Sequence, residues 1–166
     1  EDARDLLDQA IDLVKEAVHA FGGSVARIQG DGVMAMFGVM AVIEDHALRA
    51  ALAACRIRDR VTLLQSGQGG EIRIRVGVHS GPILLRWLDS DFGRVLDAVG
   101  QAAHIAGKVE QNAPPNSVAI SGETLAMIDE PVTSSLLMTV SLAEADQPLE
   151  VHQLESVDAG LSAKVS

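Results

Sequence analysis

The feature that most restricts the fold is a pair of short apolar runs, residues 24–29 and 33–37, separated by little more than Gly30-Asp31-Gly32. Glycine and aspartate tolerate the backbone angles of tight turns, so these three residues predict the tip of an antiparallel β-hairpin. A hairpin this early in the chain argues against a doubly wound parallel sheet. Asp31 is expected at an exposed sheet edge, as either a structural turn residue or a ligand.

Segments with helical and strand-like spacing surround this hairpin. Apolar residues recur three and four positions apart over 7–21 and 48–64, which is typical of amphipathic helices, and residues 72–79 alternate like a half-buried strand. Further strands are expected at 83–87, 95–99, 118–121, 136–141 and 149–154, and further helices at 100–113 and 123–128. The predicted fold class is α+β, formed by a single domain over residues 1–166.

Composition and charge exclude several classes of protein. Hydrophobic residues make up 48% of the chain, but no run approaches the roughly eighteen apolar residues of a membrane span. The net charge of -10 opposes binding to the phosphate backbone of nucleic acids. The first residues lack the basic start and apolar stretch of a signal peptide, so a cytoplasmic location is expected.

Five segments carry a resemblance to a known family: residues 21–38, 44–50, 75–82, 97–100 and 120–124. In order and spacing they resemble the catalytic domains of class III adenylate and guanylate cyclases of the bacterial type. The resemblance implies a ferredoxin-like core, with the opening strand missing from this sequence. It also implies a homodimer, or a pair with a homologous cyclase domain, and conversion of ATP to 3′,5′-cyclic AMP and pyrophosphate for intracellular signalling.

The same resemblance implies two divalent metal ions, Mg²⁺ or Mn²⁺, held by two aspartates. Asp31 matches the second of these aspartates, and carboxylate oxygens are the ligands that such hard cations prefer. In the family the first aspartate lies on a strand before the opening helix, and this sequence begins after that point. One carboxylate makes a poor two-metal site, so weak activity is expected of residues 1–166.

Two positions match the family's base-reading residues. Arg27 stands where adenylate cyclases usually carry a lysine, and Asp97 stands where an aspartate accepts a hydrogen bond from the adenine amino group. This favours ATP over GTP as the nucleoside triphosphate. Without the resemblance, Arg27 is simply an exposed strand residue and Asp97 a turn residue.

His104 and Lys108 occupy the positions of the family's asparagine, which orients the ribose, and arginine, which stabilises the pentavalent phosphate. Their spacing of four places them on one helix face, and both can donate hydrogen bonds. Lysine keeps the charge of arginine but loses its bidentate geometry. A solvated helix face is the structural alternative.

These substitutions keep a second function open, in which the domain is a catalytically degenerate module for regulation, nucleotide binding or dimerisation. A generic ferredoxin-like ligand-binding domain would require the serial matches to be accidental. Ser80 and Ser121 are expected in turns, and the spacing of His79 and the other scattered histidines does not suggest a zinc site.

Overall fold

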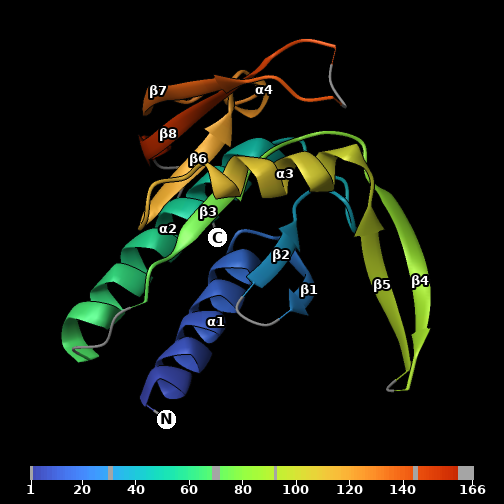
Figure 1. Ribbon diagram of the computed structural model, residues 1–166, viewed down its shortest axis with the longest axis vertical. Coiled ribbons are helices and arrows are strands. Elements are labelled where there is room, and N and C mark those ends of the chain that lie inside the picture. Colours follow the sequence, from blue (N-terminus) through green and yellow to red (C-terminus); the bar gives the residue numbers. More distant parts are fainter. Residues whose placement is uncertain (1, 30–31, 69–71, 92, 144–145, 161–166) are drawn as a thin grey trace.

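The computed structural model describes residues 2–29, 32–68, 72–91, 93–143 and 146–160 (Figure 1). The helices are α1 (Asp2–Ala20), α2 (His46–Gln68), α3 (Gln101–Gln111) and α4 (Gly122–Leu125). The strands are β1 (Ser24–Gln29), β2 (Gly32–Met36), β3 (Arg75–Val78), β4 (Leu84–Ser90), β5 (Gly93–Val99), β6 (Ser117–Ser121), β7 (Val132–Val140) and β8 (Leu149–Val157). Across these residues, no helix combines the length and apolar character needed to cross a membrane.

A four-stranded sheet with the order β3-β6-β8-β7 forms the centre of the fold. β8 runs antiparallel to both of its neighbours, which confirms an α+β class with much antiparallel pairing. β3 and β6 are parallel, whereas the hairpins in the sequence suggested antiparallel pairing. The reason is the long connection between these two strands, which contains β4, β5 and α3 and so allows a crossover.

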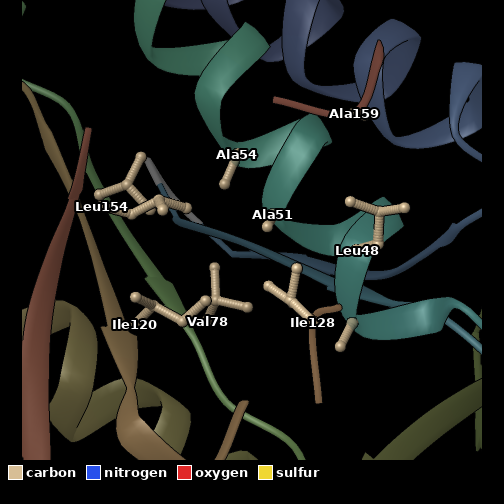
Figure 2. Close-up of a cluster of buried hydrophobic side chains, with 10 residues drawn as sticks. Leu48, Ala51, Ala54, Val78, Ile120, Ile128, Leu154 and Ala159 are labelled. Carbon is tan, nitrogen blue, oxygen red and sulfur yellow. The ribbon is translucent and has the colours of Figure 1, made fainter. Parts of the chain in front are cut away.

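The central sheet is covered by helices on both of its faces. All five residues of β6 are buried, and alternate residues of a strand point to opposite faces. Val118 and Ile120 join one hydrophobic cluster with α2, whereas Ala119 joins another with Ile105 and Val109 of α3. Figure 2 shows the first cluster, in which small residues of α2 approach side chains from β3, β6 and β8.

α1 packs on α2 through the face that the apolar spacing predicted. Val18 of α1 and Val61 of α2 are almost fully buried in their shared cluster, and Val25 and Ala35 of the β1–β2 hairpin pack against it. The hairpin is therefore held against the helical pair, apart from the four-stranded sheet (Figure 1). Full burial of side chains such as Val18 and Val61 contributes about 1.5–3 kcal/mol each.

β4 and β5 form a hairpin, here called the arm, that extends away from the central sheet (Figure 1). The sequence predicted strands at 83–87 and 95–99 with a polar loop over 89–94. Instead the ladder continues to the Ser90↔Gly93 pair, and Asp89 lies opposite Arg94 with 3.4 Å between their charged atoms. Asp89, Ser90, Gly93 and Arg94 are thus strand residues, and they lack apolar alternation because this part of the arm has no buried face.

Candidate active site

Asp97 lies near the middle of β5 and is the most buried charged group at the site. The residue is 7% exposed, and its Oδ1 atom is 3.4 Å from Nη1 of Arg27 on β1. Its Oδ2 atom is 3.5 Å from Nη2 of Arg86, which stands directly opposite on β4. A buried carboxylate is destabilising unless it is paired, and the two guanidinium groups supply that pairing. The structure thus brings the two predicted base-reading residues together and adds a third residue, Arg86.

The charge of this cluster is not balanced. One carboxylate and two guanidinium groups leave a net positive site, and the Arg27 and Arg86 side chains are 45% and 56% exposed. Arg27 also lies 4.0 Å from the sulfur of Met34 on β2, its cross-strand neighbour. The site therefore combines a buried acceptor with exposed donors that an approaching ligand can reach.

The metal-binding prediction lies at the tip of the β1–β2 hairpin. Asp31 is outside the described residues, although the Gln29↔Gly32 pair on either side of it closes the hairpin as predicted. Within the described ranges, no three His, Cys, Asp or Glu residues gather in a way that could hold a metal ion.

α3 carries His104 and Lys108 and starts directly after β5. Gly100 precedes the helix with a φ of 130°, a value that favours glycine, and its carbonyl accepts a hydrogen bond from the His104 amide at 3.2 Å. Ala102, Ile105 and Val109 are the buried residues of α3. His104 is exposed and Lys108 is half-buried, so both predicted residues lie on the accessible side of one helix.

α3 approaches β3 very closely, and Gly77 makes this possible. A Cβ atom at Gly77 would lie 2.5 Å from the backbone nitrogen of Glu110. Any other residue would push the helix away from the strand. The position of His104 and Lys108 relative to the sheet therefore depends on a glycine in the resembling segment 75–82.

A cavity of about 470 Å³ lies between β2 and β3, and we call it the strand slot. Every residue from 32 to 39 and from 74 to 81 contributes to its lining. A sheet face would contribute alternate residues, so the consecutive lining indicates that both strands present an edge to the slot. Among the described strands, β2 pairs with β1 and β3 pairs with β6, which leaves one edge of each toward this cavity.

A chain of buried and half-buried polar side chains joins the end of β3 to the end of β6. Nδ1 of His79 is 2.8 Å from Oγ of Ser121, which is 2.9 Å from Oγ1 of Thr124, and this hydroxyl donates to Oγ of Ser80 at 3.0 Å. With the Thr124 hydroxyl donating to Ser80, every group in the chain is satisfied when Ser121 donates to Thr124 and Nδ1 of His79 donates to Ser121. We therefore assign the proton of neutral His79 to Nδ1.

Burial is the main influence on this histidine. It lowers the pKa of His79 from its ordinary range, and the negative charge of Glu123 opposes the change. Ser121 also accepts a hydrogen bond from the Thr124 amide and so caps α4. The serines predicted as turn residues thus belong to a buried network, and Ser121 and Thr124 are both 0% exposed.

Comparison with known proteins assigns the chain to a family. Residues 1–155 match the family described as the adenylate and guanylate cyclase catalytic domain. The chain belongs to this cyclase family. The predicted family is therefore confirmed.

Relatives include both kinds of cyclase. Adenylate cyclase 1 of Rhizobium meliloti is 24% identical over 163 residues, which cover 95% of this chain and 24% of that protein. The guanylate cyclase soluble subunit beta-2 of Rattus norvegicus is 32% identical over 93 residues, or 55% of this chain and 14% of that protein. The cyclase domain described here thus spans about a quarter or less of these relatives.

Solved structures confirm the fold of the cyclase domain. The guanylate cyclase domain of RhGC from Catenaria anguillulae, in complex with GTP, has a TM-score of 0.82 at 22% identity and covers 94% of this chain and 85% of that one. The adenylyl cyclase CyaB from P. aeruginosa has a TM-score of 0.77 at 19% identity and covers 92% of this chain and 82% of that one. At these identities the likeness establishes the fold alone.

Sequence reasoning about this cyclase domain missed Arg86 and the His79 network. Arg86 could have been found only through the register of β4 against β5, which places it opposite Asp97. His79 and Ser121 are 42 positions apart, and no local pattern connects them. Both omissions concern contacts between segments that are distant in the sequence.

Proposed function

We propose that this domain converts ATP to 3′,5′-cyclic AMP and pyrophosphate. One observation supports this function most directly, the guanidinium of Arg27 beside the buried carboxylate of Asp97. The two side chains present a donor next to an acceptor, which complements the ring nitrogen N1 and the amino group of adenine. In this function Asp97 accepts from the amino group and Arg27 donates to the ring.

The α3 residues act on the ribose and phosphates in this proposal. The 3′-hydroxyl oxygen forms a bond to the α-phosphorus, the bond from that phosphorus to the bridging oxygen of pyrophosphate breaks, and the hydroxyl proton passes to solvent. Lys108 stabilises negative charge that develops on the phosphate oxygens, and His104 donates a hydrogen bond that orients the ribose. Their positions on the accessible side of α3 support these roles.

Asp31 is our candidate for one metal ligand. A Mg²⁺ or Mn²⁺ ion bound there would lower the pKa of the 3′-hydroxyl and neutralise phosphate charge. We infer that a second carboxylate comes from another segment, because one carboxylate makes a poor two-metal site. The strand slot offers a place for it, because a strand that pairs with both β2 and β3 would satisfy two open edges.

A designed N-terminal extension tests the use of the slot. The extension adds an apolar, β-branched strand that carries one aspartate, and its matched control carries asparagine at the same position. Both extensions are expected to protect the backbone amides of β2 and β3 from hydrogen exchange, and only the aspartate form is expected to increase Mn²⁺ binding. Unchanged exchange in β2 and β3 would exclude the slot as a strand-binding site.

We further propose a homodimer, or a pair with a homologous cyclase domain. The arm supports this proposal because Leu84, Trp87 and Leu88 expose 66%, 57% and 40% of their surface on one hairpin. Sedimentation equilibrium is expected to show concentration-dependent association that Leu84→Ser with Trp87→Ser weakens. Leu63→Ser is the matched control, since Leu63 is 73% exposed on α2, away from the arm. A strict monomer at all concentrations would argue against a composite site.

The second candidate function is a nucleotide-binding or regulatory module with little turnover. The replacements at Arg27, His104 and Lys108 favour it. In either case we infer one domain over residues 1–166 and a cytoplasmic role in cyclic-nucleotide signalling. We also infer that the partner is a nucleoside triphosphate and not a nucleic acid, because a net charge of -10 opposes binding to a phosphate backbone.

Nucleotide binding and product formation separate these functions. Calorimetry with ATP and Mn²⁺ is expected to show binding that Asp97→Ala weakens about 10- to 100-fold, the range for a hydrogen bond to a charged group. The exposed Asp129→Ala serves as the control. Binding with cyclic AMP formation supports a cyclase, and binding without product supports the module. If neither ATP nor GTP binds, the cyclase and the nucleotide-binding module both fail, and only a regulatory or dimerisation role without nucleotide is left.

A further inference from the structure

The two oxygens of the Asp97 carboxylate are held by different arginines. Arg27 is 3.4 Å from Oδ1, and Arg86 is 3.5 Å from Oδ2. Arg86 comes from the arm, where it is the direct cross-strand partner of Asp97. Since each guanidinium approaches its own oxygen, the two sides of the carboxylate face different neighbours.

We propose that Arg86 is a specificity-determining residue that restricts Asp97 to a single acceptor for the base. This inference rests on the proposed role of Asp97 in base recognition. Oδ2 faces Arg86, so the oxygen beside the Arg27 donor is Oδ1, which accepts from Arg27 at 3.4 Å and has a second lone pair for the base. The site then offers one donor and one acceptor, side by side.

Adenine and guanine differ in how they fit this arrangement. Adenine presents one acceptor, N1, next to one donor, the amino group, so Arg27 and Oδ1 of Asp97 satisfy it. Guanine presents the acceptor O6 followed by two donors, N1–H and the amino group. The second guanine donor would need Oδ2, where it would instead meet the donor groups of Arg86.

The cost to guanine is one unsatisfied donor in a partly buried site. Leaving a buried donor without a partner costs more free energy than a typical hydrogen bond contributes. Arg86 therefore acts mainly by excluding guanine. Removing Arg86 frees Oδ2 to accept the second guanine donor. The carboxylate stays paired through Arg27, which is on a different strand.

The test compares ATP and GTP binding to Arg86→Ala by calorimetry in the presence of Mn²⁺. The wild type is expected to bind ATP more tightly, and the variant is expected to lower the ratio of the GTP to the ATP dissociation constant about tenfold or more, chiefly by tighter GTP binding. Arg86→Lys, which keeps the charge but loses the planar fork, should give a smaller change. It also provides a second measurement if the alanine variant is unstable.

Arg94→Gln is the matched control on the same arm. Its partners are Asp89 near the hairpin tip and the ring of Trp87, neither of which touches Asp97, so it should leave the nucleotide ratio unchanged. A purely structural role of Arg86 would weaken both nucleotides together, and an unchanged ratio in folded variants would overturn the inference while the proposed function stands. A wild type that already prefers GTP would also overturn it. Failure of the wild type to bind either nucleotide would instead remove the base site itself.

Discussion

Thr124→Val tests whether the hydroxyl network stabilises the junction of β3, β6 and α4. The substitution keeps the shape of the side chain but removes two hydrogen bonds, those that Thr124 makes with Ser121 and Ser80. Ser121 is 0% exposed, so its hydroxyl would lose its acceptor without access to bulk water, at a cost of about 1–3 kcal/mol. The lost bond to half-buried Ser80 adds about 1 kcal/mol, and the extra methyl group offsets up to about 0.8 kcal/mol.

The net expectation for Thr124→Val is a loss of about 2 kcal/mol in the free energy of unfolding, measured by urea denaturation. For a chain of this length the melting temperature should fall by roughly 4–8 °C. Thr133→Val on the exposed surface of β7 is the control and should stay within about 0.5 kcal/mol of the wild type. If the two variants were equally stable, the network would have no energetic role and our proton assignment for His79 would lose its support.

Further predictions concern the same region. Burial lowers the pKa of His79 in the folded state, so near the ordinary histidine pKa of about 6.5 the unfolded protein binds more protons at this residue than the folded protein. The contribution of His79 to stability should therefore be complete above that pH and be lost as the pH drops toward the folded-state pKa. The free energy of unfolding, measured at several pH values, should show a smaller loss on acidification in His79→Gln and a larger loss in Glu123→Gln. If His79→Gln instead lost more stability on acidification than the wild type, the lowered pKa of His79 would be contradicted. Gly77→Ala should destabilise the fold by about 1–3 kcal/mol, since its Cβ would meet the α3 backbone. It should also weaken ATP binding or turnover through displacement of α3, whereas Gly107→Ala, with nothing within 4 Å of its Cβ, should leave both intact.

Local patterns predicted the elements that have a distinct buried face. α1 buries the apolar positions that recur three and four residues apart, and Val18 is 1% exposed in its contact with α2. The β1–β2 hairpin forms around the glycine-flanked tip, and α3 occupies the stretch expected from 100 to 113 with slightly shorter bounds. These segments could be predicted because the period of the apolar residues and the turn residues indicate the same structure.

The arm shows where local patterns are insufficient. β4 is exposed on both faces for most of its length, so apolar alternation does not extend to the Ser90↔Gly93 pair. The pairing of Arg86 with Asp97 depends on the register, which the sequence does not specify without a buried face. The family resemblance identified Arg27 and Asp97 in advance, and the structure places them 3.4 Å apart. The metal role of Asp31 stays a prediction, because that residue lies outside the described part of the chain.

The β1–β2 hairpin connects the base site to the strand slot. β1 contributes Arg27, and β2 presents its open edge to the slot. A two-stranded hairpin is marginally stable alone, so its position depends on packing against α1 and on the ion pair between Arg27 and Asp97. A strand that filled the slot would fix β2 relative to β3 through backbone hydrogen bonds. It would thereby also fix Arg27 relative to Asp97, so occupation of the slot and recognition of the base are expected to be energetically coupled.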